Sequence, residues 1–87
     1  MAVRTPLPFK MKIKQIIGWY GVLAIITAFA LLNFGILGTD NLVYQLLNLT
    51  GAIGIIIEAG AKNDYQPVAL NIVWLLVATY GLLRTLL

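Results

Sequence analysis

The stretch IIGWYGVLAIITAFALLNFGIL, residues 16–37, decides the fold of this chain, because it contains no charged residue. About 20 predominantly apolar residues in a helix are enough to cross the roughly 30 Å hydrocarbon core of a bilayer. Two further apolar runs follow, at residues 42–61 and 66–84, and short polar turns separate the three runs. Since a backbone in lipid must satisfy its own hydrogen bonds, we predict an all-α membrane protein with three transmembrane helices in an up-down-up bundle.

The composition supports a membrane protein and argues against an enzyme. Of the 87 residues, 61% are hydrophobic and 10% are charged, whereas roughly a quarter of the residues in a soluble domain are charged. The chain has no Cys, no His and only three acidic residues. Because these residue types supply most nucleophiles, general bases and metal ligands, we expect no catalytic site, no metal site and no cofactor.

The positive charges are concentrated at the start of the chain, whose net charge is +3. A basic segment, residues 1–15, precedes the three-helix transmembrane domain, residues 16–87. Lys62 lies in the second turn, whereas the first turn has no basic residue. The excess of basic residues on cytoplasmic loops then predicts a cytoplasmic N-terminus and second turn, with the C-terminus outside. The basic residues of the first segment are Arg4, Lys10, Lys12 and Lys14.

The expected partners of the basic segment are lipid headgroups. The segment is short and adjoins a predicted span, which argues against binding to nucleic acid. Each basic residue near an anionic membrane surface contributes about 1 kcal/mol of attraction. We therefore expect the chain to contact the lipid bilayer and to have no nucleic-acid partner.

Small residues recur on one face of each predicted helix. They allow two helix backbones to approach closely, and such packing drives helix association in lipid. We therefore predict that these small residues pack helices together, within one chain or between copies. The candidates are Gly21, Ala28 and Gly35 in the first helix, Gly51 and Gly54 in the second, and Gly81 in the third.

Polar side chains of the second and third helices form the other group of candidates, namely Asn48, Glu58, Asn71 and Trp74. Exposing them to lipid would leave polar groups without hydrogen-bond partners. They serve either as interhelical hydrogen bonds or as the lining of a solute path. The indole N–H of Trp74 needs an acceptor, such as Asn48 or Glu58.

Glu58 has two interpretations of its own. A carboxylate inside a membrane span is a candidate functional group. However, Glu58 lies near the end of the second run and precedes Lys62 by four residues, which is the favourable order for an ion pair on a helix. An interfacial acid that pairs with a neighbouring lysine requires no further role.

Two stretches resemble a known family. They are YQLLNLTGAIG, residues 44–54, and DYQPVALNIVW, residues 64–74. The second contains a Tyr-x-Pro…Leu-Asn-x-x-Trp pattern, and the two together are similar to a family of small bacterial inner-membrane proteins of unknown function. The resemblance covers roughly the second and third helices. It implies three helices in a bacterial inner membrane and implies no activity.

A weaker likeness is to the three-helix half-transporters of the PQ-loop and SemiSWEET kind. They share the length, the number of helices and an inward-facing Asn in the third helix. The chain departs from them because its first helix has no proline, whereas theirs carries a Pro-Gln pair. Gln66-Pro67 here has the reverse order and lies elsewhere.

Two functions are consistent with these patterns. The first is a non-catalytic accessory or structural subunit that self-associates or packs against a larger membrane complex. The alternative is a homodimeric half-transporter, which moves a small solute along the polar residues of its second and third helices. Both predict a homo-oligomer or a larger membrane-protein partner.

Overall fold

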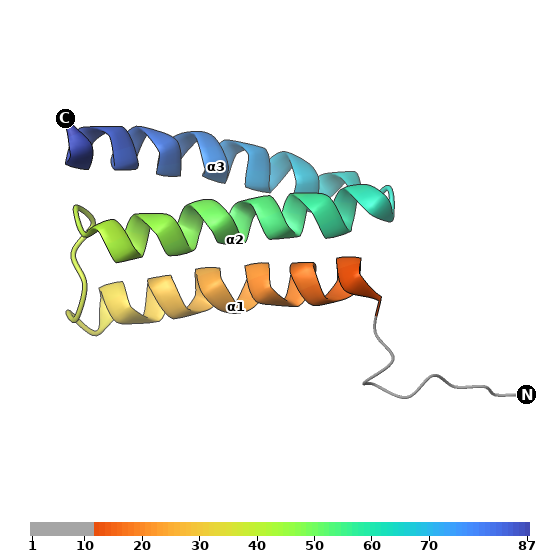
Figure 1. The fold of residues 1–87 in the computed structure, drawn as a ribbon, viewed down its shortest axis with the longest axis horizontal. Helices are drawn as coiled ribbons and strands as arrows, with labels where there is room; N and C mark the ends of the chain where they lie inside the picture. Colours follow the sequence, from red (N-terminus) through yellow and green to blue (C-terminus); the bar gives the residue numbers. More distant parts are fainter. Residues whose placement is uncertain (1–11) are drawn as a thin grey trace, which may run out of the picture.

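The computed structural model describes residues 12–87, which form three helices in alternating directions (Figure 1). The helices are α1 (Ile13–Asn33), α2 (Leu42–Ala61) and α3 (Tyr65–Leu86). Each is long and apolar enough to cross a membrane, which confirms the prediction of three long apolar helices. Residues 1–11, including Arg4 and Lys10 of the predicted basic segment, lie outside the described residues.

The three helices lie in a row with α2 in the middle (Figure 1). Among the described residues, α1 packs only against α2, and α3 packs only against α2. The alternating order therefore matches the prediction, but the single chain does not close into the expected bundle. A row of helices leaves one side of α1 and most of α3 without a protein neighbour.

Helix α1 ends earlier than its apolar sequence suggests, because Gly35 stops it. Gly35 has a φ of +78°, which favours glycine. The amide of Gly35 donates to the Leu32 carbonyl, and that of Ile36 donates to the Leu31 carbonyl at 2.9 Å. These two bonds form a Schellman motif, which satisfies the last carbonyls of the helix. Residues 34–37, predicted as helix, thus form the start of the first turn.

Helix α2 is closed by side-chain and backbone bonds at its two ends. The Asn41 side chain accepts hydrogen bonds from the amides of Val43 and Tyr44 and caps the first turn. At the other end, Asn63 has a φ of 59°, and the amide of Asp64 donates to the Ala59 carbonyl at 2.9 Å. The same type of motif therefore ends α1 with a glycine and α2 with an asparagine.

Glycines bring α1 and α2 into backbone contact. A Cβ atom on Gly21 would overlap the Gly51 carbonyl oxygen, and one on Gly54 would lie 2.7 Å from the Ile17 carbonyl oxygen. Ala28 is fully buried. The small face predicted for the first helix thus packs against α2 of the same chain. Gly35 is the exception, because it lies in the turn with no atom near its Cβ position.

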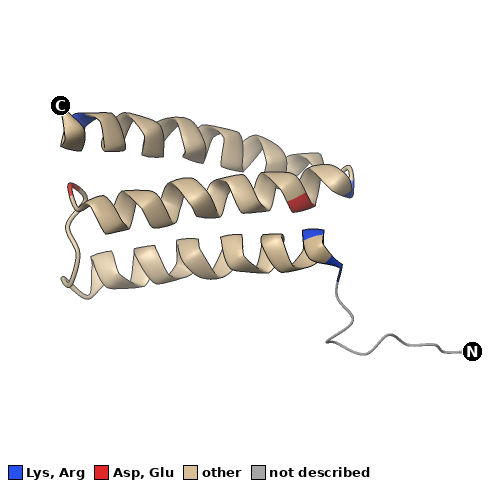
Figure 2. Cartoon of the chain, in the orientation of Figure 1, with Lys and Arg blue, Asp and Glu red and all other residues tan. Residues whose placement is uncertain are grey.

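Basic residues gather at one end of the row (Figure 2). Lys12 and Lys14 lie at the start of α1, and Lys62 follows α2, so all three lie at the end where α3 begins. The opposite end carries Asp40 in the first turn and Arg84 near the end of α3. The structure therefore places three of the four described basic residues, Lys12, Lys14 and Lys62, on the same side of any membrane that the helices cross.

Candidate functional site

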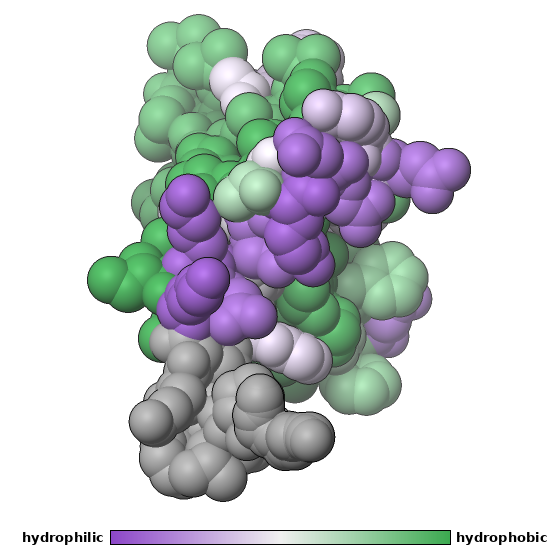
Figure 3. Space-filling model, turned by 90° about the vertical axis from the view of Figure 1, so that its right-hand side faces the viewer, coloured by the Kyte–Doolittle hydropathy of each residue, from purple (hydrophilic) through white to green (hydrophobic). Residues whose placement is uncertain are grey.

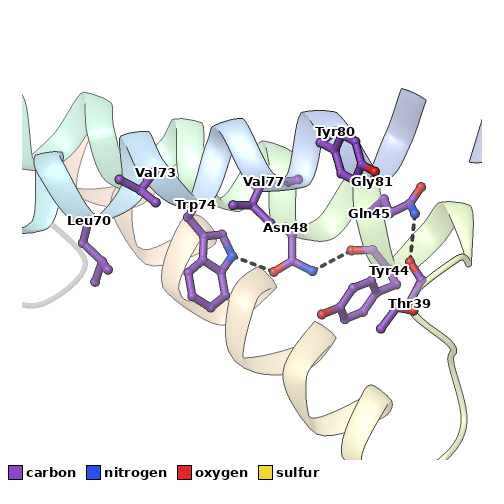
Figure 4. A pocket seen from close by; sticks show the side chains of 11 residues that line it. Thr39, Tyr44, Gln45, Asn48, Leu70, Val73, Trp74, Val77, Tyr80 and Gly81 are labelled. Atoms are coloured by element: carbon purple, nitrogen blue, oxygen red, sulfur yellow. Dashed lines mark hydrogen bonds between the residues drawn. The ribbon is translucent and has the colours of Figure 1, made fainter. Parts of the chain in front are cut away.

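An open groove runs between α2 and α3, with a volume of about 560 Å³ (Figure 4). We call it the α2–α3 groove. Most of its wall is apolar, and a few polar side chains point into it, an arrangement typical of binding surfaces. Its lining includes Tyr44, Gln45, Asn48, Trp74, Val77 and Gly81.

A hydrogen bond between α2 and α3 forms part of the groove. The indole N–H of Trp74 donates to Asn48 Oδ1 at 2.8 Å, and the Asn48 amide in turn donates to the Tyr44 carbonyl at 2.8 Å. Asn48 is 5% exposed, whereas Trp74 is 38% exposed. The predicted indole acceptor is therefore confirmed as Asn48. Trp74 nevertheless lies at the groove and not inside a closed core.

Gln45 joins three segments at the end of the groove nearest the first turn. Its Nε2 donates to the Thr39 carbonyl at 2.8 Å and to the Thr85 hydroxyl at 2.7 Å. Thr85 donates to the Asp40 carbonyl at 3.2 Å, which ties the end of α3 to the first turn. Gln45 Oε1 is buried and has no hydrogen-bond partner among the described residues. A buried acceptor of this kind normally has a partner.

Gln45 was absent from the residues that the sequence analysis selected. Gln45 lies three residues before Asn48 and therefore on nearly the same face of α2. This spacing was the one sequence feature that could have indicated Gln45 as a groove residue. Gly81 lies beside it, because a Cβ on Gly81 would stand 3.4 Å from Gln45 Nε2. Gly81 therefore does pack against α2, but it contacts the Gln45 side chain and not the α2 backbone.

Asn71 does not join the groove. Its amide donates to the Pro67 carbonyl at 2.8 Å, one turn earlier in α3. Asn71 is buried, and its side-chain amide finds its hydrogen-bond acceptor within its own helix. The structure therefore brings Asn48 and Trp74 together but leaves Asn71 apart from them.

Glu58 lies on the other side of α2, toward α1. It forms an ion pair with Lys62 at 2.9 Å, four residues later, as the sequence predicted. Its side chain fits against Gly18, where a Cβ would lie 2.6 Å from Glu58 Cβ. The hydrogen bond and the negative charge of Glu58 raise the pKa of Lys62 above its ordinary value of 10.5. Lys62 therefore stays charged at neutral pH.

A second groove, of about 340 Å³, surrounds this ion pair. We call it the α1–α2 groove. It opens at the basic end of the row. One of its lining residues, Gly18, was not among the glycines predicted to pack helices together. The three-residue spacing of Gly18 and Gly21 could be read from the sequence. Only the structure shows that Gly18 leaves room for the Glu58 side chain. The groove is lined by Gln15, Gly18, Trp19, Val22, Ile55, Glu58 and Lys62.

The four polar candidates therefore fall into separate places. Asn48 and Trp74 line the α2–α3 groove, Glu58 lines the α1–α2 groove, and Asn71 lines neither. In the part of the chain from residue 12 onward, no three acidic, Cys or His side chains gather in a way that would hold a metal ion. What the arrangement offers is two grooves of different shape, each with its own hydrogen-bonding side chains.

Comparisons with known proteins give one match. A family of unknown function matches residues 14–87. No curated protein is significantly similar in sequence, and no solved structure is significantly similar in fold. Because the match covers most of the chain, including all but the first residue of α1 and the whole of α2 and α3, the chain belongs to this family of unknown function.

Proposed function

We propose that the chain is a non-catalytic membrane subunit that assembles through its α2–α3 groove, with a second copy of itself or with a larger membrane protein. The observation that carries the proposal is the open groove beside α3. Helix α3 packs against α2 alone, and the residues that it buries are Asn71 and Ala78. A helix from another subunit would fill the groove and cover the rest of α3.

The polarity of the groove supports a protein occupant. Lipid chains offer no hydrogen bonds, so a polar side chain at a lipid-facing groove gains from a partner that does. The Tyr44 side chain points into the groove near Asn48 and Trp74 (Figure 4). A neighbouring helix can place a polar side chain against these groups. We commit to a second copy as the occupant, because the helices of the chain itself carry exposed polar side chains, among them Thr27, Thr50 and Tyr80.

The surrounding membrane is part of the same proposal. The resemblance to bacterial inner-membrane proteins supports that location. The basic residues at one end support a cytoplasmic position for the start of α1 and the second turn, with the C-terminus outside. The lack of Cys and His in the sequence supports a role without catalysis.

The test is the mass of the particle purified through a C-terminal tag from gently solubilised native membranes. A homo-oligomer supports self-assembly, and a stoichiometric foreign protein identifies a larger complex. A monomer without a partner contradicts the proposal.

A matched pair of substitutions locates the interface. Val77 lines the groove and is 64% exposed, whereas Leu76 lies outside it and is 65% exposed. Val77→Trp fills the groove and should shift the particle toward the monomer by about ten-fold, the effect of about 1.4 kcal/mol. Leu76→Trp should leave the assembly unchanged. Equal effects of the two variants would place the interface elsewhere.

The homodimeric half-transporter remains the second candidate. It is favoured by Asn48 and Trp74, which lie together in one groove and would line a path between two copies. It is weakened by Glu58 and Asn71, which lie outside that groove. Uptake of sugars, amino acids or cations into liposomes, lost in Asn48→Leu, would support it. Uptake equal to that of empty liposomes would exclude it for those solutes.

A further inference from the structure

The α1–α2 groove changes from polar to apolar along its length. Gln15, Glu58 and Lys62 lie toward the basic end of the row, whereas Val22 and Ile55 lie further into the helices. A groove that is polar at the membrane surface and apolar below it matches the shape of an amphiphile. Trp19 lies between the two parts, at the depth where tryptophan is enriched in membrane proteins.

The polar end of this groove carries an available positive charge. Lys62 is 58% exposed in its side chain and uses one of its three N–H donors on Glu58. Lys12 and Lys14 are exposed at the same end. Figure 3 shows hydrophilic side chains gathered over this end of the row, with apolar atoms around them. An anionic group placed there meets lysines from both α1 and the second turn.

Gly18 explains how an acid fits in the same groove. Without a Cβ on Gly18, the side chain of Glu58 lies against α1, and its carboxylate pairs with Lys62, one turn further along at the end of α2. Glu58 therefore positions Lys62 and at the same time neutralises part of its charge. These two effects act in opposite directions on an anionic ligand.

We infer that the α1–α2 groove binds one anionic phospholipid, with its phosphate at Lys62 and Gln15 and an acyl chain along Val22 and Ile55. The apolar half of the groove selects a lipid over a free anion, because burial of a chain there removes apolar surface from water or from poorly packed lipid. This site lies on the opposite side of α2 from the assembly groove, and the inference stands whether or not the chain assembles.

The test measures contact between Trp19 and brominated lipid, because bromine in an acyl chain quenches indole fluorescence at short range. The full chain is placed in phosphatidylcholine nanodiscs that contain a small fraction of brominated phosphatidylglycerol or brominated phosphatidylcholine. The chain has two Trp residues, so the same measurement on Trp19→Phe subtracts the signal of Trp74. We expect several-fold stronger quenching of Trp19 by the anionic lipid. Equal quenching by the two lipids would overturn the inference.

Substitutions in the ion pair give a directional test. Lys62→Gln should lower the preference for the anionic lipid by about five-fold, the effect of about 1 kcal/mol for one basic residue near the surface. Glu58→Gln keeps the packing against Gly18 and an oxygen that can accept a hydrogen bond from Lys62, but it removes the negative charge. It should therefore increase the preference. A decrease in Glu58→Gln would contradict the assigned role of Lys62.

A third comparison separates the groove from general attraction to a basic surface. Val22→Phe fills the apolar half of the groove, whereas Leu23→Phe introduces the same side chain at an exposed position outside it. We expect the anionic preference to fall in Val22→Phe alone. An unchanged preference in Val22→Phe would show that surface charge acts without the groove. Inorganic phosphate at matched ionic strength should not compete, and competition would identify a free anion as the ligand instead of a lipid.

Discussion

The two interfaces of α2 are built in different ways. Toward α1, glycines place backbone against backbone, and Gly21, Gly51 and Gly54 have no space for a further carbon atom. Toward α3, side chains fill the contact, with a Trp74–Asn48 hydrogen bond and an open groove beside it. In lipid, an apolar side chain is about as stable against the lipid chains as against another helix. Close packing and hydrogen bonds are therefore the main sources of helix association. Close backbone packing distinguishes the α1 side of α2, whereas the α3 side is held by side-chain contacts and the Trp74–Asn48 hydrogen bond.

The difference assigns different roles to the two contacts. Along its glycines, the α1–α2 contact is complete within one chain, because Gly21, Gly51 and Gly54 already meet the facing helix. The α2–α3 contact leaves a groove that a further helix can enter. We therefore expect the first interface to tolerate almost no added volume and the second to tolerate some.

The largest expected effect comes from the same substitution made in each interface. Gly21→Ala places a methyl group on the Gly51 carbonyl oxygen and should destabilise the chain by about 1–3 kcal/mol through overpacking. Gly81→Ala meets only the Gln45 side chain, at 3.4 Å. It should stabilise the chain by up to about 1 kcal/mol, because alanine favours helix over glycine. Reversible unfolding in mixed detergent measures both, and equal effects would remove the distinction between the interfaces.

An intermediate effect is expected from the hydrogen bond that joins α2 and α3. Trp74→Phe removes the indole donor, and Asn48→Ala removes its acceptor. The coupling between them in a double-mutant cycle should be about 0.6–1.7 kcal/mol, the range measured for side-chain hydrogen bonds within membranes. A coupling near zero in the same unfolding assay would mean that packing alone holds α3 against α2.

The smallest effect is expected from the side-chain hydrogen bond between α1 and α2. The Tyr20 and Thr50 hydroxyls lie 2.7 Å apart, but Thr50 also donates to the Leu46 carbonyl at 2.7 Å. Tyr20→Phe therefore leaves Thr50 with a partner and should cost about 0.5 kcal/mol or less. A larger loss of unfolding free energy would show that this interface depends on hydrogen bonding as well as on close packing.

Several features could be predicted from the sequence, and most of them depend on residues close together in the chain. The three spans follow from hydropathy, and their lengths agree with the helices. The Glu58–Lys62 pair follows from the spacing of neighbours on one helix. The pairing of Trp74 with an acceptor followed from the cost of a buried donor, although Glu58 was an equal candidate before the structure placed it on the α1 side of α2.

Other features required the tertiary structure. Asn48 and Glu58 were grouped from the sequence as polar candidates of the second helix, but they line different grooves, since α2 lies between two helices. Gly35 continued the small-residue spacing of the first helix, yet its left-handed backbone ends that helix. Periodicity alone cannot distinguish a glycine that packs from a glycine that terminates.

The sequence by itself determined that the chain forms three helices, each long and apolar enough to cross a membrane, with short turns between them. The cost of placing backbone and charge in lipid leaves few other solutions for such apolar runs. Only the tertiary structure decided that these helices lie in a row and that an open groove lies on each side of α2. The physical reason is that lateral packing in lipid depends on small differences in shape and hydrogen bonding between distant residues. Such differences leave no regular pattern along a single helix.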